Sequence, residues 1–457
     1  MHDVTIIGAG VSSIFLALSL IEKSPDCRIH VIDKGKPLAE RSCGLDEGRA
    51  CTCEDGCEKY IGFAGLGKSE GKFNYTNDFG GELAQKIGET ESLRYMRKVD
   101  QILCSFGGDA VEKYSTKNEH LSQRSARYAL NVFSTDVRHL GTGLAQSIFQ
   151  KMYDQLIQQV SFTFCTSVQK LERIRKGFRI QTNSGDFFSS KVVLATGNSG
   201  SEWLHSMADK LGLKPQKTRL DLGIRVEMRG NQLDSILQDT FETKLNIKTD
   251  TFSATTYCMN PNGRIIRKYQ HGLVMPDGQN KREKKTPGSN LNFSLFVPRY
   301  YDNHKEAMSA AERVIGGINR GSNRIVVQRY EDLRAGKRSK GSCEGSICPS
   351  LQAEAGDLRE EVPDLYIESL LEFFTRLEGL LGESIDSDTL LYGLDAKFYE
   401  AHIFTDPYFQ TSLSGLYLVG DCSGVTHSLA QAAASGLYLG QHMVSSQAVN
   451  YQSADMI

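Results

Sequence analysis

A glycine-rich turn near the start of the chain carries the residue types that hold a pyrophosphate. Gly8 and Gly10 follow a short apolar run and precede a stretch with helical spacing. The first glycine allows a tight turn, and the second lets the backbone approach a phosphate at the positive end of the helix. Asp33 ends the next apolar run, where a carboxylate accepts hydrogen bonds from a ribose. The spacing predicts a dinucleotide site made of Gly8, Gly10, Ser12, Ser13, Asp33 and Lys34.

Two later apolar runs also end in small residues. The run Val192–Leu194 leads into Ala195, Thr196 and Gly197, and Leu416–Val419 leads into Gly420 and Asp421. In this order, with a β-rich insert between them, they resemble the two-domain FAD oxidoreductases related to the flavin domain of glutathione reductase. The resemblance implies that Asp421 binds the ribityl or pyrophosphate region of FAD. It also implies that the helix after Thr426 directs its N-terminus at the flavin N1–C2 carbonyl. Val168, which begins a predicted strand, is expected at the same site.

Further stretches narrow the resemblance to the uncharacterised FAD-dependent dehydrogenases, and it then covers most of the chain. The similar segments are Gly62–Phe73, His139–Thr142, Gly197–Gly200, Leu222–Glu227 and Tyr257–Gly263. The family implies FAD and a redox role but supplies no substrate. Ala64 and Leu66 break the family's glycine loop, and Glu70 stands where aspartate is usual.

The loop within Gly62–Phe73 also satisfies the pattern of a nucleotide-binding P-loop, Gly-x4-Gly-Lys-Ser. A P-loop lies between a buried strand and a helix. Neither neighbour is indicated here, so we interpret the match as coincidence. Gly65, Gly67 and Lys68 are instead predicted to cradle the FAD pyrophosphate with backbone N–H groups and one positive charge.

Four cysteines crowd into one short stretch: Cys43, Cys51, Cys53 and Cys57. Such thiolates could hold a zinc ion or an iron–sulfur cluster, and a cluster beside a flavin would transfer electrons. The spacing is not the usual paired CxxC, so free thiols or a redox dithiol remain open alternatives.

Catalytic candidates are few. A flavin enzyme needs a substrate carbon near flavin N5 and often an acid or base beside it. His427 follows the Gly420–Asp421 turn, and Lys397 lies in Tyr392–Lys397, just before the C-terminal segment. A capping role for His427 and a solvated position for Lys397 are the alternatives. NAD(P)H has no second complete fingerprint, so it is expected to bind transiently if it is the reductant.

Hydrophobic periodicity indicates how these residues are positioned. Strand, helix and strand alternate at the start of the chain, whereas residues 220–300 alternate apolar and polar residues, as in an antiparallel sheet. Turns are predicted at Asn262-Gly263 and Asp277-Gly278. We expect an α/β fold: a discontinuous Rossmann-type FAD-binding domain (1–215, with a cysteine-rich loop at 43–57, and 386–457). An inserted β-rich α+β substrate domain (216–385) interrupts it.

Composition limits the classes of function. The formal net charge of the 457 residues is −2, which argues against a nucleic-acid or anionic-membrane partner. The apolar start, Val4–Ile21, is interrupted by glycines and serines, so it reads as strand and helix and a cytoplasmic location is expected. The partner is expected to be a small organic substrate between the two domains; the oligomeric state is not indicated.

Several functions fit these features. The leading hypothesis is an FAD-dependent dehydrogenase or reductase that passes hydride through flavin N5. A flavin monooxygenase is the alternative within the enzyme class. A redox sensor that uses Cys43–Cys57 and a flavin-bound RNA-modification component are the alternatives outside it. A pure NAD dehydrogenase would leave the Gly420–Asp421 segment unexplained.

Overall fold

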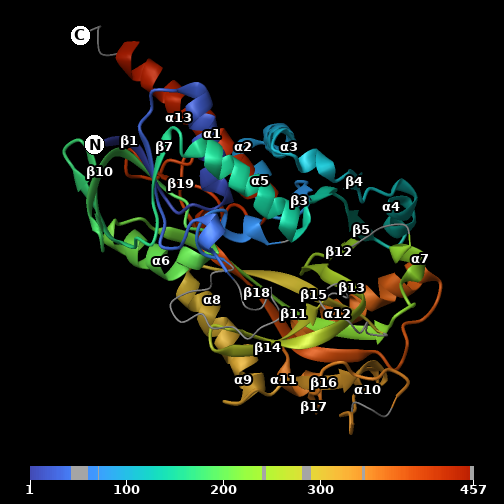
Figure 1. The fold of residues 1–457 in the computed structure, drawn as a ribbon. Helices are drawn as coiled ribbons and strands as arrows, with labels where there is room; N and C mark the ends of the chain where they lie inside the picture. Colours follow the sequence, from blue (N-terminus) through green and yellow to red (C-terminus); the bar gives the residue numbers. More distant parts are fainter. Residues whose placement is uncertain (43–59, 70, 239–242, 280–289, 342–344, 453–457) are drawn as a thin grey trace. The chain divides into compact units, whose positions relative to one another are not determined.

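The chain divides into two compact units in this computed structural model (Figure 1), which describes residues 1–42, 60–69, 71–238, 243–279, 290–341 and 345–452. Unit 1 comprises residues 1–115, 135–216 and 399–457, and unit 2 comprises residues 116–134 and 217–398. Two segments therefore lie elsewhere than the predicted domain limits place them. Residues 116–134 and 386–398 belong to unit 2, because they pair as strands or pack as a helix with its sheet.

Unit 1 is built on a parallel sheet. Strand β1 (His2–Ile7) pairs with β2 (Ile29–Ile32), and β2 pairs with β7 (Val160–Thr163). On its other side β1 pairs with β10 (Gly185–Leu194), which pairs in turn with β19 (Leu416–Leu418). All four pairings are parallel. This order confirms the predicted Rossmann-type, discontinuous α/β fold, since the last strand comes from the far end of the chain.

A three-stranded antiparallel meander extends this sheet. It consists of β8 (Val168–Ile174), β9 (Gly177–Thr182) and the first half of β10. Residues 185–189 of β10 pair with β9, whereas residues 191–194 continue into the parallel sheet beside β1. The bounds of β8 and β9 match the sequence prediction, because alternating side chains and the Lys176-Gly177 turn define both strands locally.

Helices cover the parallel sheet and bury its apolar side chains. They are α1 (Val11–Lys23), α3 (Glu89–Ser105), α5 (Gly141–Leu156) and α13 (Leu429–Gln452). Gly436 and Gly440 let α13 approach α1 closely: a Cβ at Gly436 would lie 2.1 Å from the Ser12 carbonyl oxygen. Buried residues such as Phe15, Phe149 and Leu437 fill the core between these elements, each contributing about 1.5–3 kcal/mol.

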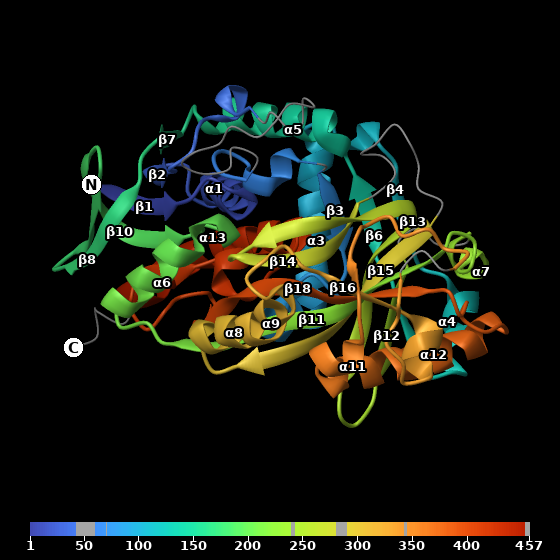
Figure 2. The same cartoon turned by 90° about the horizontal axis from the view of Figure 1, so that it is seen from below.

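Unit 2 is built on a second, mainly antiparallel sheet (Figure 2). Its strands follow the order β17-β16-β18-β11-β15-β13-β12-β5, with β14 beside β13. The bounds are β5 (Leu130–Phe133), β11 (Pro215–Arg229), β12 (Lys244–Lys248), β13 (Ser253–Gln270), β14 (Leu273–Gln279), β15 (Asn290–Tyr301), β16 (Val326–Arg329), β17 (Glu354–Ala355) and β18 (Leu390–Ile403). Helix α12 (Asp364–Leu381) packs Phe373, Phe374 and Leu377 into the same apolar core as β11 and β15.

Two turn predictions in this sheet were wrong. Asn262-Gly263 lies inside β13, at a register irregularity, and Asp277-Gly278 lies inside β14. The hairpin between β13 and β14 turns instead at His271-Gly272, whose φ angles are +52° and +72°. Asn262 does adopt a positive φ of +53°, so the asparagine–glycine pair was used for a bulge rather than for a turn.

The remaining elements are short. Unit 1 contains a small sheet of β3 (Lys72–Tyr75), β4 (Lys113–Ser115) and β6 (Asp136–His139), and helices α2 (Leu83–Ile87) and α6 (Ser201–Lys210). Unit 2 contains helices α4 (Glu119–Ala126), α7 (Asp234–Leu237), α8 (His304–Ala311), α9 (Gly317–Asn319), α10 (Tyr330–Arg334) and α11 (Leu358–Glu361). Among the described residues, no helix combines the length and apolar character needed to cross a membrane.

Candidate functional site

Four strand ends meet at the carboxyl edge of the parallel sheet in unit 1. Backbone hydrogen bonds link the residues that leave these strands: Gly8 donates to the Ile32 carbonyl (2.8 Å) and Ala195 donates to the Ile7 carbonyl (2.8 Å). Val419 donates to the Leu194 carbonyl at 3.0 Å. The turns after β1, β2, β10 and β19 are thus neighbours, although the chain separates the first from the last by about four hundred residues.

The first turn leaves an open space at the start of α1. Gly8 has a φ of +104°, and a Cβ there would lie 2.4 Å from the Ala195 carbonyl oxygen, so only glycine fits. Ser13 supports the turn, because its hydroxyl donates to the Gly8 carbonyl at 2.6 Å. A Cβ at Gly10 would meet nothing within 4 Å, and no side chain caps the helix at this residue. An anion therefore has both room and first-turn N–H donors at Gly10.

Asp33 is fixed beside this turn. Its two carboxylate oxygens accept hydrogen bonds from the backbone N–H groups of Ala9 and Gly35, both at 2.7 Å. Burial raises the pKa of Asp33, and the two N–H donors oppose that shift. Each carboxylate oxygen can accept a further hydrogen bond, so the group fits a ribose diol. Lys34 points elsewhere: its ammonium group is exposed and donates to the Ser199 carbonyl at 3.2 Å.

The glycine loop packs against the same turn. A Cβ at Gly65 would lie 3.5 Å from Gly10 Cα, which places this loop along the opening. Gly67 has a different role, since a Cβ there would collide with Val11 and Phe149 at 2.7–2.8 Å. Gly67 therefore permits close packing of the loop on α1 and α5. Lys72–Tyr75 after the loop is a strand and not a helix, which confirms that the P-loop match is coincidental.

Arg41 holds this loop in place, and sequence reasoning missed it. Its buried guanidinium donates to the carbonyls of Phe63 and Gly65, the latter at 3.1 Å. The buried Lys68 donates to the Arg41 carbonyl at 3.0 Å, so the ammonium group reaches back into the protein. A basic residue just after Asp33 in a glycine-flanked segment was the only signal in the sequence, and it is a weak one.

The turn after β19 is equally constrained. Gly420 has a φ of +74°, and a Cβ there would lie 2.5 Å from the Ser12 hydroxyl. The fully buried Thr426 donates its hydroxyl to Asp421 Oδ1 at 2.9 Å, which fixes that carboxylate ahead of α13. After β10, Gly197 adopts a φ of +57°, and the Thr196 side chain packs where a Cβ of Gly200 would lie.

Val168 lies on the antiparallel meander of the same unit. Its side chain is buried, and its carbonyl accepts a hydrogen bond from Trp203 Nε1 at 2.6 Å. The structure thus brings the predicted residues of all four turns to one edge. The assignment of individual FAD contacts to these residues stays a prediction.

The two catalytic candidates belong to different units. His427 is half-buried in unit 1, where its ring meets the Tyr399 ring edge-on at a centroid distance of 4.5 Å. Lys397 belongs to unit 2, where its ammonium group lies 4.7 Å from the centre of the Tyr257 ring. Tyr392, expected on a solvated face as readily as near the flavin, is fully buried and donates to Glu227 Oε2 at 2.7 Å.

Glu400 is a second residue of unit 1 that the sequence did not indicate. Its buried carboxyl group accepts a hydrogen bond from the Ser201 hydroxyl at 2.7 Å, and His205 Nε2 lies 3.8 Å away. Burial, together with the negative charge of Asp421, raises the pKa of Glu400 to about 7. This carboxyl therefore titrates near neutral pH, which is the property of a group that exchanges protons with a ligand.

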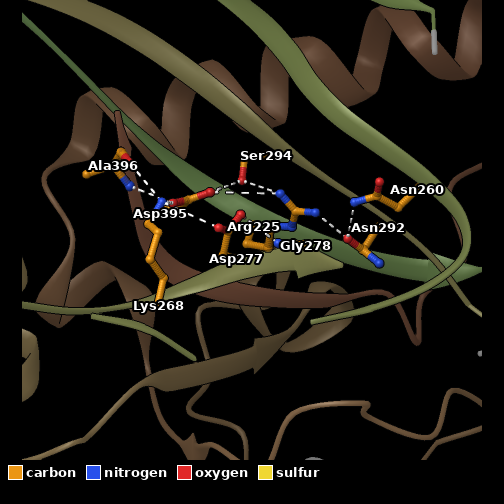
Figure 3. A network of polar contacts seen from close by, with 9 residues as sticks. All are labelled: Arg225, Asn260, Lys268, Asp277, Gly278, Asn292, Ser294, Asp395 and Ala396. Atoms are coloured by element: carbon orange, nitrogen blue, oxygen red, sulfur yellow. Dashed lines mark hydrogen bonds and ion pairs between the residues drawn. The ribbon is translucent and has the colours of Figure 1, made fainter. Parts of the chain in front are cut away.

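Unit 2 contains a buried polar network (Figure 3). Arg225 is fully buried and donates to Ser294 Oγ at 3.0 Å and to Asn292 Oδ1. Ser294 donates to Asp395 Oδ2 at 2.6 Å, and Lys268 donates to Asp395 Oδ1 at 2.8 Å. The participating side chains come from β11, β13, β15 and β18, so the network ties four strands together.

The cysteine prediction falls outside the described residues: Cys43, Cys51, Cys53 and Cys57 all lie within 43–59. Within the part of the chain that the structure describes, no group of three or more histidine, cysteine, aspartate or glutamate side chains is arranged to hold a metal ion.

Comparison with solved structures finds similar folds at low identity. The flavoprotein-named chain FrdA of Escherichia coli quinol fumarate reductase matches with a TM-score of 0.40 and 12% identity, over 98% of this chain and 70% of that one. Glycine oxidase from Bacillus cereus gives 0.36 and 12%, over 98% and 96%. Aklavinone-11 hydroxylase, solved with FAD and aklavinone, gives 0.37 and 11%, over 99% and 63%. No protein-family model matches the chain, and no curated protein matches it.

Proposed function

We propose that this protein is an FAD-dependent oxidoreductase, a dehydrogenase or reductase of a small organic substrate. The observation that supports it is the edge of the parallel sheet in unit 1. There, an open helix N-terminus at Gly10, the ribose-compatible Asp33 and the fixed carboxylate of Asp421 all lie on neighbouring turns. An NAD-binding fold needs the first two features alone, whereas a cofactor that extends past β19 also uses the third.

The residues present fit FAD in distinct ways. The Gly10 turn and the first N–H groups of α1 would bind the pyrophosphate, Asp33 would accept from the adenosine ribose, and Asp421 would accept from the ribityl chain. Bound FAD would supply hydride transfer at flavin N5. The N-terminus of α13, just after Thr426, carries a partial positive charge that stabilises negative charge nearby.

His427 is the residue we propose for proton transfer in unit 1. Its backbone N–H donates to the Gly80 carbonyl at 2.9 Å, and Tyr399 holds the ring from one side. The residue is thereby oriented at the entry to α13 while its side chain stays partly exposed. NAD(P)H as a transient reductant and a cytoplasmic location are part of the same proposal, as is a substrate without nucleic acid or membrane character.

The first experiment is an absorbance spectrum of the protein purified without oxygen, followed by denaturation and analysis of the released cofactor. Flavin bands with released FAD are the expected result. A colourless protein that also fails to take up added FAD would overturn the proposal. Broad additional absorbance with bound iron would assign a cluster to the cysteine segment, and oxygen uptake with NADPH would favour a monooxygenase over a dehydrogenase.

A further inference from the structure

The buried carboxyl group of Glu400 stands beside the proposed FAD site, and the following inference rests on that proposed function. Glu400 lies on the part of β18 that belongs to unit 1. Its Oε2 atom accepts a hydrogen bond from Ser201 at the start of α6 (2.7 Å). Ser201 follows the turn Asn198–Gly200 that leaves β10, so Glu400 is anchored to one of the four turns at the edge of the sheet.

Three titratable groups face Glu400 from the elements around it. His205 on α6 lies 3.8 Å away, but burial lowers the pKa of that imidazole, so the histidine is a poor source of positive charge. Asp421 adds a negative charge, and burial holds Cys422 as a neutral thiol with a pKa of about 12. On its own strand, His402 is paired with Glu82 at 3.4 Å. The dominant charge acting on Glu400 is therefore that of Asp421.

Asp421 cannot readily move away from Glu400. Thr426 donates to its Oδ1 atom at 2.9 Å, and Gly420 is locked by its positive φ and by contact with Ser12. The pyrophosphate of FAD would add further negative charge at the same edge. A unit charge about 10 Å away in an effective dielectric of about 20 changes a proton-binding constant roughly tenfold.

We propose that FAD binding is coupled to the uptake of one proton by Glu400, so that Glu400 and Asp421 are not both ionised beside the bound pyrophosphate. The proton comes from solvent and ends on the Glu400 carboxylate; no other bond changes. By linkage, a ligand that raises proton affinity must itself bind more weakly as the proton is removed. FAD affinity should accordingly fall as pH rises through neutrality.

The test uses calorimetric titration of flavin-free protein with FAD, at about pH 6, 7.5 and 9, in buffers of different ionisation enthalpy. Proton uptake per FAD is obtained from the buffer dependence. For the wild-type protein we expect uptake of about half a proton or more near pH 7.5, and a Kd that rises roughly tenfold from pH 6 to 9. For Glu400→Gln, which keeps a hydrogen-bonding side chain of the same size, we expect little uptake and less than about a threefold change in Kd.

Two variants serve as controls. Glu202→Gln removes the same charge from an exposed position on α6, and His205→Gln removes the neighbouring imidazole. Both should keep the proton uptake of the wild type. Wild-type binding without proton uptake overturns the inference whether or not Glu400→Gln folds, and so does undiminished uptake in Glu400→Gln. Failure of the wild type to bind FAD at any pH is a different result, because it overturns the proposed function as well.

Discussion

Two glycines of the first turn should respond to the same substitution in opposite ways. At Gly10 the backbone has a φ of −73°, which alanine adopts, and a Cβ would meet no atom within 4 Å. Gly10→Ala should therefore change the free energy of unfolding by less than about 1 kcal/mol, because a weaker helix cap offsets a smaller unfolded-state entropy. At Gly8 the φ of +104° and a contact of 2.4 Å with the Ala195 carbonyl predict a loss of about 2–5 kcal/mol.

FAD binding should show the reverse order of informative effects. The methyl group of Gly10→Ala occupies the space that we assign to the pyrophosphate, so the Kd for FAD should rise by about tenfold or more in a protein of normal stability. Urea unfolding of the flavin-free protein gives the first quantity, and quenching of FAD fluorescence gives the second. If Gly10→Ala binds FAD like the wild type, the opening at α1 is not the pyrophosphate site and the reasoning fails.

Three further predictions follow from contacts of the two units. The Glu400 carboxyl has a raised pKa of about 7 against an ordinary value of 4.5, so the folded state holds the proton longer and stability falls as pH rises between these values. The unfolding free energy of Glu400→Gln relative to wild type should thus increase by about 3 kcal/mol from about pH 4.5 to pH 8 in urea titrations; a constant difference would refute this. Arg225→Met leaves Asp395 with Lys268 as its remaining cation and should cost about 3 kcal/mol in chemical denaturation, and a loss below about 1 kcal/mol would show that the pair is not net stabilising. Thr426→Val removes the donor to Asp421 and should raise the Kd for FAD about fivefold, as measured by fluorescence, whereas Thr426→Ser should stay near wild type.

The glycine and acid positions of unit 1 were predictable because local rules determine them. A strand, a tight turn and a helix N-terminus are set by residues that are adjacent in sequence, and the β1–α1–β2 elements lie within one residue of the predicted bounds. The same holds for β8 and β9. The resemblance to a family then supplied the link to Gly420 and Asp421, which no local rule provides.

Arg41 and Glu400 escaped prediction because their roles depend on distant partners. Arg41 is functional only through the carbonyls of Phe63 and Gly65, and these come close because the glycine loop folds back onto α1. Glu400 acquires its raised pKa from burial against α6 and from Asp421, neither of which is adjacent in sequence. Gly67 illustrates the opposite error, since a glycine in a phosphate-like loop turned out to serve packing.

The polar positions of β11 show why an alternating pattern predicts a strand better than it predicts exposure. Leu222, Ile224 and Val226 face the apolar core as expected, and the intervening Arg225 and Glu227 would normally face water. Both are instead completely buried. A Cβ at Gly278 would lie 1.5 Å from Arg225 Nη2, so the β13–β14 hairpin covers this face and leaves no room for a side chain. A buried charge must be paired, and the chain pairs it with Asp395 from β18. The hairpin turn at His271-Gly272, rather than the predicted one at Asp277-Gly278, places Gly278 within a strand over that charge. The misplaced turn and the unexpected burial therefore have one cause.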